Sequence, residues 1–86
     1  MLRVNRKVEY ALTALKFMSE KKQGELSRAR EIGERFNAPF DTVAKVMQSL
    51  NISGVLVSVK GVKGGYQISK DLHQITYMDL VRIIEG

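Results

Sequence analysis

The sequence predicts a mainly α-helical protein with one small β-hairpin, and three observations support this fold class. Residues 39–53 carry apolar side chains at helical spacing. A tight turn at Asn37, a residue type that tolerates the left-handed conformation, joins them to a shorter helical segment at 28–36. A basic, glycine-containing loop at 60–65 then connects two short strand-like runs. Two helices joined by a tight turn and followed by a basic hairpin are typical of the winged helix-turn-helix fold.

The helix predicted at 39–53 sorts its side chains into two stripes. Its apolar stripe consists of Val43, Val46, Met47 and Leu50. Its polar stripe consists of Asp41, Thr42, Lys45, Gln48 and Ser49. Short hydrogen-bonding groups and a single cation suit base edges and phosphates in the major groove of DNA. The alternative is an ordinary solvated face, because every amphipathic helix carries polar residues on its outer side.

The length and composition of the chain limit the number of domains and the kinds of site that it can contain. A chain of 86 residues predicts one domain, residues 1–86. It has no cysteine, so a disulfide framework, a thiolate metal site and a cysteine nucleophile are excluded. The N-terminal residues match no secretory signal and no apolar stretch approaches transmembrane length, so we expect a cytoplasmic protein without a membrane partner.

The charge of the chain favours a polyanionic partner. Fourteen Lys and Arg residues against nine Asp and Glu residues give a net charge of +5. An excess of this size is typical of proteins that contact nucleic-acid phosphates and release counterions. The alternative is that the charge serves only solubility.

Two helices are predicted before the central one. Asn5 is a suitable N-cap for a helix at about 5–19. The apolar residues of this helix that repeat at helical spacing are Val8, Ala11, Leu12, Leu15 and Met18. Ser27 is a suitable N-cap for a helix at about 28–36, in which Phe36 is expected to be buried.

A hairpin and a last helix are predicted after the central helix. Gly54 ends the central helix, and a wing of two strands follows at about 55–69. Thr76 and Asp79 form a capping box for a helix at about 77–85. The apolar residues of this helix cover more than one stripe: Tyr77, Met78, Leu80, Val81, Ile83 and Ile84. We therefore expect a partner subunit or further chain to cover part of this surface.

The wing loop combines glycines with two cations, Lys60 and Lys63. Glycine permits close backbone approach and lysine suits phosphates or a narrow minor groove, whereas the alternative is an ordinary flexible hairpin. His73 is the only histidine, and with no cysteine or second histidine beside it we expect a surface loop residue. No serine, histidine and acid are grouped at triad-like positions, so the sequence does not support an enzyme.

Four segments that together span the chain form a specific pattern: Val8 to Leu12, Arg30 to Arg35, Val59 to Tyr66 and Ile75 to Val81. In this pattern the chain resembles the Rrf-type transcriptional regulators, the relatives of IscR, NsrR and CymR. The resemblance implies a bacterial dimeric regulator whose third helix enters the major groove and whose wing touches the minor groove. By position, it implies groove-reading residues at Asp41, Thr42, Ala44 and Lys45 and a wing cation at Lys60.

The chain departs from this family pattern in two respects. Ala44 stands where many members have an acid, which changes the DNA sequence that the third helix would read. Past the position of Gly86 the family usually continues into a long dimerisation helix and a loop whose three cysteines hold an iron–sulfur cluster. This chain has no cysteine, so we expect no cofactor and no metal site in it. Glu9 falls where some members supply a carboxylate ligand to the partner subunit's cluster, and a solvated or salt-bridged glutamate is the alternative.

Together these features predict a sequence-specific regulator that binds double-stranded DNA and forms a homodimer through residues at or beyond its last helix. The residues predicted to contact DNA come from the first helix, the third helix and the wing: Arg3, Arg6, Lys7, Asp41, Thr42, Lys45, Gln48, Lys60 and Lys63. One alternative is a winged helix used as a protein-interaction module through its apolar last helix. Another is a winged helix that binds RNA.

Overall fold

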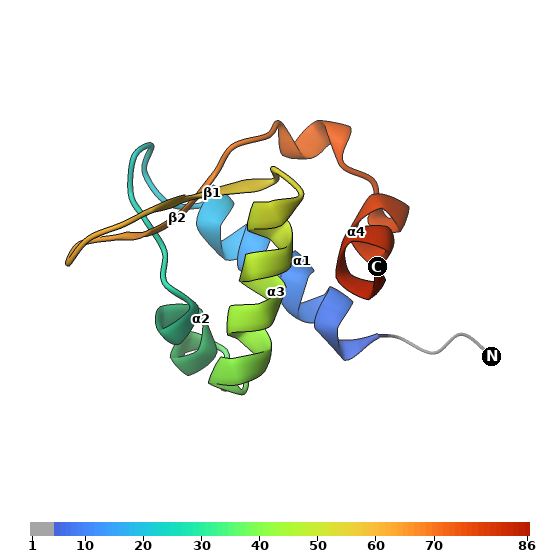
Figure 1. Ribbon diagram of the computed structural model, residues 1–86, viewed down its shortest axis with the longest axis horizontal. Coiled ribbons are helices and arrows are strands. Elements are labelled where there is room, and N and C mark those ends of the chain that lie inside the picture. Colours follow the sequence, from blue (N-terminus) through green and yellow to red (C-terminus); the bar gives the residue numbers. More distant parts are fainter. Residues whose placement is uncertain (1–4) are drawn as a thin grey trace.

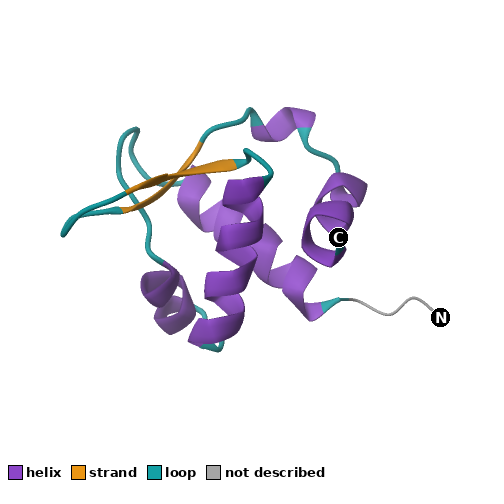
Figure 2. Ribbon diagram, in the orientation of Figure 1, coloured by secondary structure: helices purple, strands orange, loops and turns teal. Residues whose placement is uncertain are grey.

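The computed structural model describes residues 5–86, so the predicted phosphate contact Arg3 lies outside the described residues. The elements in chain order are α1 (Arg6–Ser19), α2 (Ala29–Arg35), α3 (Phe40–Ile52), β1 (Leu56–Val59), β2 (Gly65–Ile68), the 3-10 helix η1 (Leu72–Gln74) and α4 (Tyr77–Glu85). The hairpin projects from one side of the helices, and α4 lies on the other side (Figure 1). Helices dominate and the two strands form the only sheet within residues 5–86 (Figure 2). The predicted fold class, a mainly α-helical winged helix-turn-helix, is confirmed.

Helix α3 lies at the centre and contacts α1, α2, α4 and β1. Its predicted apolar stripe is buried, with at most 2% of each side chain exposed. The core is completed by α1, α2, the start of the hairpin and α4 through Val8, Ala11, Ala14, Leu15, Met18, Ile32, Val55, Leu56 and Leu80. Because these residues surround only one side of α3, its polar stripe is left facing outward.

The turn between α2 and α3 has the predicted left-handed residue, since Asn37 has a φ of 53°. Helix α2 approaches this turn closely at Gly33. A Cβ atom at Gly33 would lie 3.1 Å from the carbonyl oxygen of Ala38, and the Ala38 N–H donates to the Gly33 carbonyl at 2.8 Å. Pro39 is the extended N-cap of α3, with φ −60° and ψ 128°.

The wing pairs β1 with β2 in antiparallel register, with Ser58 opposite Tyr66. Ser27 adds an isolated bridge to Tyr66, through N–H to O distances of 2.9 and 2.8 Å between the two backbones. The prediction that Ser27 caps α2 is therefore wrong. Its extended backbone is used for pairing, its side chain is buried, and Arg28 takes the N-cap position instead.

Some residues expected in the core are partly exposed. Leu12 is 42% exposed, because α1 turns Ala14 inward in its place and the buried stripe passes beside Leu12. Phe36 is 39% exposed and is not among the apolar residues packed against the core; its ring lies perpendicular to that of Phe17, with centroids 5.7 Å apart. Both predictions counted a large apolar side chain as core from its spacing alone.

Helix α4 begins with the predicted capping box. The Asp79 N–H donates to the Thr76 hydroxyl at 3.0 Å, and the Thr76 N–H donates to the Asp79 carboxylate at 2.9 Å. The hydrogen bond that the Thr76 backbone donates, followed by one from the Thr76 side chain, lowers the pKa of the Asp79 carboxyl below its ordinary value. Only Leu80 of this helix is fully buried. Among residues 5–86, none of the helices has the length and apolar character needed to cross a membrane.

Candidate nucleic-acid interface

Helix α3 presents a polar surface that no other element within residues 5–86 covers. Asp41, Lys45 and Gln48 are exposed, and Thr42 is half-buried. Asp41 lies in the first turn of the helix, where a negative charge interacts favourably with the helix dipole. Within residues 5–86 the Asp41 side chain makes no hydrogen bond and no ion pair. The four predicted α3 contacts thus lie along one helix, and three of them are fully available to a partner.

The first turn of α1 brings a cation to α3. Lys7 lines a shallow hollow of about 310 Å³ together with Lys45 and Gln48. Arg6, the first residue of α1, is exposed beside it. The structure therefore groups Lys7 with the two predicted base-contacting residues, although about forty positions separate them in the chain.

The wing carries the second group of predicted contacts. Lys60 and Lys63 are exposed in the loop between β1 and β2, and Val62 at its tip is 93% exposed. Gly61 has a φ of 118°, a backbone conformation that residues other than glycine rarely adopt. The wing cations are not grouped with Lys45. They lie on the opposite flank of α3, where Lys60 lines a crevice with Ala44.

Two arginines beside the wing were not predicted as site residues. Arg28 Nε donates to the Gly64 carbonyl at 3.0 Å, and a second guanidinium nitrogen of Arg28 donates to the Val62 carbonyl. Arg30 lies over the ring of Phe40, with its guanidinium carbon 4.6 Å from the ring centroid. No local signal could have found the Arg28 contacts, because their partners lie 36 and 34 residues further along the chain.

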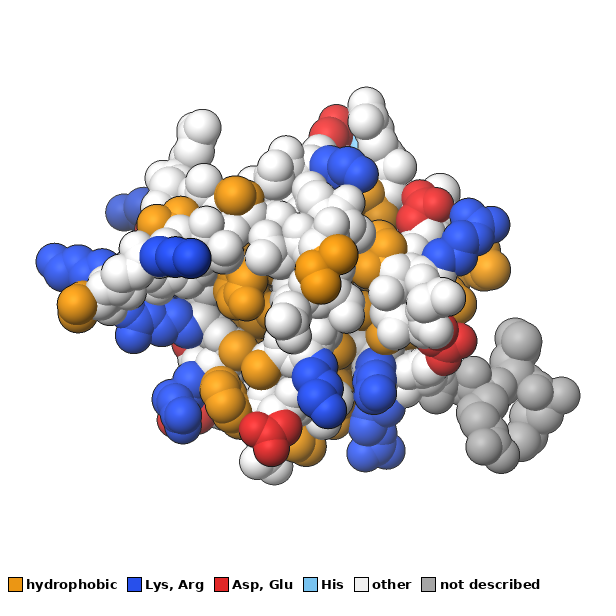
Figure 3. All heavy atoms as spheres, viewed as in Figure 1, with side chains coloured by type: hydrophobic (Ala, Val, Ile, Leu, Met, Phe, Trp, Pro, Cys, Tyr) orange, Lys and Arg blue, Asp and Glu red, His pale blue; other side chains and the backbone are white. Residues whose placement is uncertain are grey.

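The charge of this surface is not neutralised internally. Ion pairs join Lys21 to Glu31 at 2.9 Å and Arg82 to Asp79 at 3.6 Å. In the described part of the chain, none of the α1, α3 and wing cations predicted to contact DNA takes part in an ion pair, and neither do Arg28 and Arg30. Figure 3 shows Lys and Arg side chains spread from the hairpin past α2 to the lower end of α3. This face is therefore positive and suits a polyanion.

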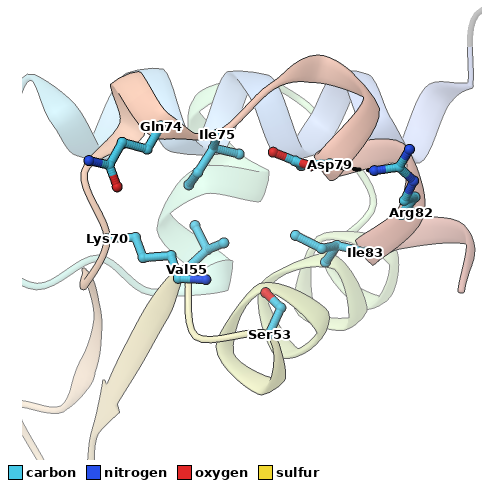
Figure 4. A pocket seen from close by; sticks show the side chains of 8 residues that line it. All are labelled: Ser53, Val55, Lys70, Gln74, Ile75, Asp79, Arg82 and Ile83. Atoms are coloured by element: carbon cyan, nitrogen blue, oxygen red, sulfur yellow. Dashed lines mark ion pairs between the residues drawn. The ribbon is translucent and has the colours of Figure 1, made fainter.

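A separate hollow of about 440 Å³ lies between the end of α3, the loop after β2, η1 and α4 (Figure 4). Its polar side chains include Lys70, Gln74, Asp79 and Arg82. Asp79 already caps α4 and faces Arg82, so its carboxylate has a structural role. His73 is exposed in η1 beside Asp71, as expected for a surface loop residue.

The sequence model of the Rrf2 family, described as an iron-dependent transcriptional regulator, matches residues 4–86. This chain belongs to the Rrf2 family. The predicted resemblance is thereby confirmed.

Rrf2 relatives resemble the chain in sequence over part of their length. A protein of Aquifex aeolicus that carries the words HTH-type transcriptional regulator in its name is 36% identical over 76 residues, which are 88% of this chain and 52% of that protein. A Rhodobacter capsulatus protein named rrf2-like is 29% identical over 86 residues, 96% of this chain and 57% of that protein. The chain thus spans about half the length of these relatives.

Solved structures share the fold at similar coverage. CymR, the global cysteine regulator of B. subtilis, superposes with a TM-score of 0.87 at 26% identity, over 100% of this chain and 67% of CymR. IscR of T. potens superposes with a TM-score of 0.83 at 25% identity, over 99% of this chain and 62% of IscR. Family and fold neighbours are therefore transcriptional regulators.

The iron in the Rrf2 family description has no matching ligands in this chain. The sequence has no cysteine, and residues 5–86 contain no group of three or more His, Asp or Glu side chains that could hold a metal ion. Glu9 is exposed in the first turn of α1 and lines a surface hollow with Tyr10, Leu12, Thr13 and Phe36, which add no second carboxylate, imidazole or thiolate. The residues present do not form an iron site by themselves.

Proposed function

We propose that residues 1–86 form one winged helix-turn-helix domain that binds double-stranded DNA sequence-specifically and thereby regulates transcription. The observation that carries this proposal is the position of the α3 polar surface between two groups of unpaired cations. Lys7 shares a hollow with Lys45 on one flank, and Lys60 shares a crevice with Ala44 on the other. A helix in the major groove needs phosphate contacts on both of its flanks to be held in register.

The proposed contacts are of two kinds: contacts to phosphates, which position the domain on the duplex, and contacts to bases, which read its sequence. Positioning contacts to phosphates come from Arg3, Arg6, Lys7, Lys60 and Lys63. Reading contacts to bases come from Lys45 and Gln48, with Asp41 and Thr42 in the turn of α3 that enters the groove. Five phosphate contacts from each protomer predict a slope of about −4.5 per bound protomer for log affinity against log salt, and about twice that slope for a dimer. For a single protomer, a fourfold rise in salt should lower affinity about 500-fold.

We further propose that the protein acts as a homodimer in the bacterial cytoplasm and is not an enzyme. Family membership supports the location, because a transcriptional regulator must reach the chromosome. The exposed apolar residues Tyr77 and Met78 of α4, 49% and 53% exposed, support association through this helix or through chain beyond it. No iron–sulfur cluster belongs to this proposal, since the chain lacks thiolate ligands.

The test is selection of duplexes from a random library at two salt concentrations, with the oligomeric state measured in the same samples. We expect a palindrome whose half-sites lie about one helical turn apart. Lys45→Ala should lower affinity mainly for the selected duplex, whereas Lys63→Ala should lower it for all duplexes and reduce the salt slope by about 1 for each bound protomer. Equal losses on selected and random duplexes in both variants would contradict the division of roles.

The second candidate is a protein-interaction module that uses the exposed apolar side of α4. Tyr77 and Met78 favour it, because exposed large apolar side chains mark interaction surfaces when they cluster. Failure of the chain to bind any duplex at low salt would favour this candidate. Preference for structured RNA over duplex DNA in competition would instead favour an RNA-binding winged helix.

A further inference from the structure

A crevice separates the wing from the two helices of the helix-turn-helix. It has a volume of about 560 Å³ and lies between the start of α2, the first turns of α3 and the inner face of the hairpin. Its lining includes three cations, Arg28, Arg30 and Lys60, and no acidic side chain. In Figure 3 apolar and basic side chains lie together in the angle below the hairpin. The crevice is thus a concave, positively charged surface.

The Arg30 side chain is held in place over an aromatic ring. Its guanidinium carbon lies 4.6 Å from the centroid of Phe40, a ring that is itself 43% exposed. A cation–π contact of this kind does not use the guanidinium N–H groups as hydrogen-bond donors to a polar acceptor, so they stay free to donate. Within residues 5–86, Arg30 makes no hydrogen bond or ion pair that would occupy those groups. Arg30 is therefore a preorganised donor for an anion.

Two hairpin residues with hydroxyl side chains line the same crevice. Ser58 and Tyr66 are directly opposite in the β1–β2 register, so their side chains lie on one face of the hairpin, and both line the crevice. Arg28 has a different role, because its guanidinium already donates hydrogen bonds to the carbonyls of Gly64 and Val62. It holds the wing against α2 and contributes charge to the wall.

We propose that this crevice binds the sugar–phosphate backbone of one DNA strand, with Arg30 as a phosphate ligand and Ser58 and Tyr66 as neutral donors beside it. The inference rests on the proposed function. In a duplex, a single strand separates the major groove from the adjacent minor groove. When α3 lies in the major groove and the wing in the minor groove, that strand passes between α3 and β1, which line the crevice through Ala44 and Ser58.

The first experiment compares the salt dependence of binding to a 20-base-pair duplex. Arg30→Ala should reduce the slope of log affinity against log salt by about 1 for each bound protomer, because one phosphate contact per protomer is lost. Arg30→Lys should retain the slope, since it keeps the charge. The control is Arg82→Ala on α4, which removes a charge from the other hollow and should leave the slope unchanged. Equal slopes for Arg30→Ala and Arg82→Ala would overturn the assignment of Arg30.

The second experiment locates the strand with a matched pair that does not depend on Arg30. Ser58→Glu puts a carboxylate into the crevice, whereas Val57→Glu puts the same charge on the opposite face of the same strand, at a residue that is already 40% exposed. We expect Ser58→Glu to weaken binding at least tenfold at low salt and Val57→Glu to weaken it less than threefold. Equal effects would overturn the inference while leaving the proposed function intact. Loss of duplex binding by the unaltered protein would overturn both.

Inorganic phosphate distinguishes a DNA strand from a small free anion as the occupant. At constant ionic strength, titration with phosphate should shift the backbone NMR signals of Ser58 and Tyr66 only at tens of millimolar, because a single phosphate lacks the neighbouring contacts of a strand. Saturation below 1 mM would identify a site for a free anion instead. The DNA inference would then be wrong.

Discussion

Replacement of Arg28 by alanine should loosen the wing without unfolding the protein. Arg28 donates to two wing carbonyls, one in a partly buried position at Gly64 and one in an exposed position at Val62. A hydrogen bond from a charged donor contributes about 1.5–3 kcal/mol when buried and less at the surface, so we expect the free energy of opening the wing tip to fall by about 2 kcal/mol. The stability of the hydrophobic core should not change, because Arg28 is not one of the core residues.

Native-state hydrogen exchange measures this opening directly. The reporter is the amide of Gly64, a buried residue whose N–H donates to the Gly61 carbonyl at 2.9 Å. A loss of about 2 kcal/mol corresponds to an exchange rate about thirtyfold faster at this amide, whereas the amide of Met47 in the core should not change. Arg28→Lys should give an intermediate rate, because an ammonium keeps the charge but cannot reach two carbonyls as a fork.

The same variant limits how much the wing contributes to DNA affinity. A shift in the wing equilibrium cannot lower affinity by more than the shift itself, so loosening of the wing accounts for at most about thirtyfold of the affinity that Arg28→Ala loses, and the lost crevice charge adds to this. A change of less than threefold at the Gly64 amide would refute the role of Arg28. Equal acceleration at Gly64 and Met47 would also refute it, because the loss would then be global.

The remaining predictions concern the hairpin, the last helix and metal binding. Gly64→Ala should destabilise the wing, because a Cβ atom there would lie 2.2 Å from the Val59 carbonyl oxygen and 2.9 Å from that of Gly61. Circular dichroism and amide hydrogen exchange in β1 and β2 would measure the loss of stability. The folded-state pKa of Asp79 is lowered, so its contribution to stability is present above about pH 4 and is lost as the pH falls through the folded pKa. Unfolding of Asp79→Asn between pH 2 and 7 should therefore show a weaker acid dependence than the unaltered protein, and an identical dependence would contradict this. Anaerobic incubation with iron and sulfide should yield no bound visible chromophore, because the chain has no thiolate; retention of one after desalting would show an unexpected ligand set.

Local signals in the sequence were sufficient for the secondary structure and much of the core. The Thr76–Asp79 capping box, the left-handed Asn37 and the buried stripe of α3 all depend on residues within a few positions of each other. The same reasoning located the exposed polar stripe of α3, because a helix that buries one stripe must expose the other. These features follow from backbone geometry and need no knowledge of distant partners.

The sequence-based predictions were wrong where a residue makes a contact with a part of the chain that is distant in sequence. Ser27 has the chemistry of an N-cap, but its backbone pairs with Tyr66 and its side chain is buried. Phe36 was expected to be buried in its helix, yet it is 39% exposed and lies edge to face against Phe17 of α1. In both cases the tertiary contact outweighs a local preference, which is worth only about 1 kcal/mol.

The sequence by itself determined the class of fold, the helix that carries the polar surface, the basic wing and the family, because each depends on short spacings and residue types. Only the tertiary structure decided that Arg28, Arg30 and Lys60 share one crevice and that Lys7 lies beside Lys45. The physical reason is that these pairs are brought together by the burial of other residues, the apolar side of α3 and the start of the hairpin. The charged side chains take no part in that burial, so their spacing in the sequence does not predict which of them become neighbours in the fold.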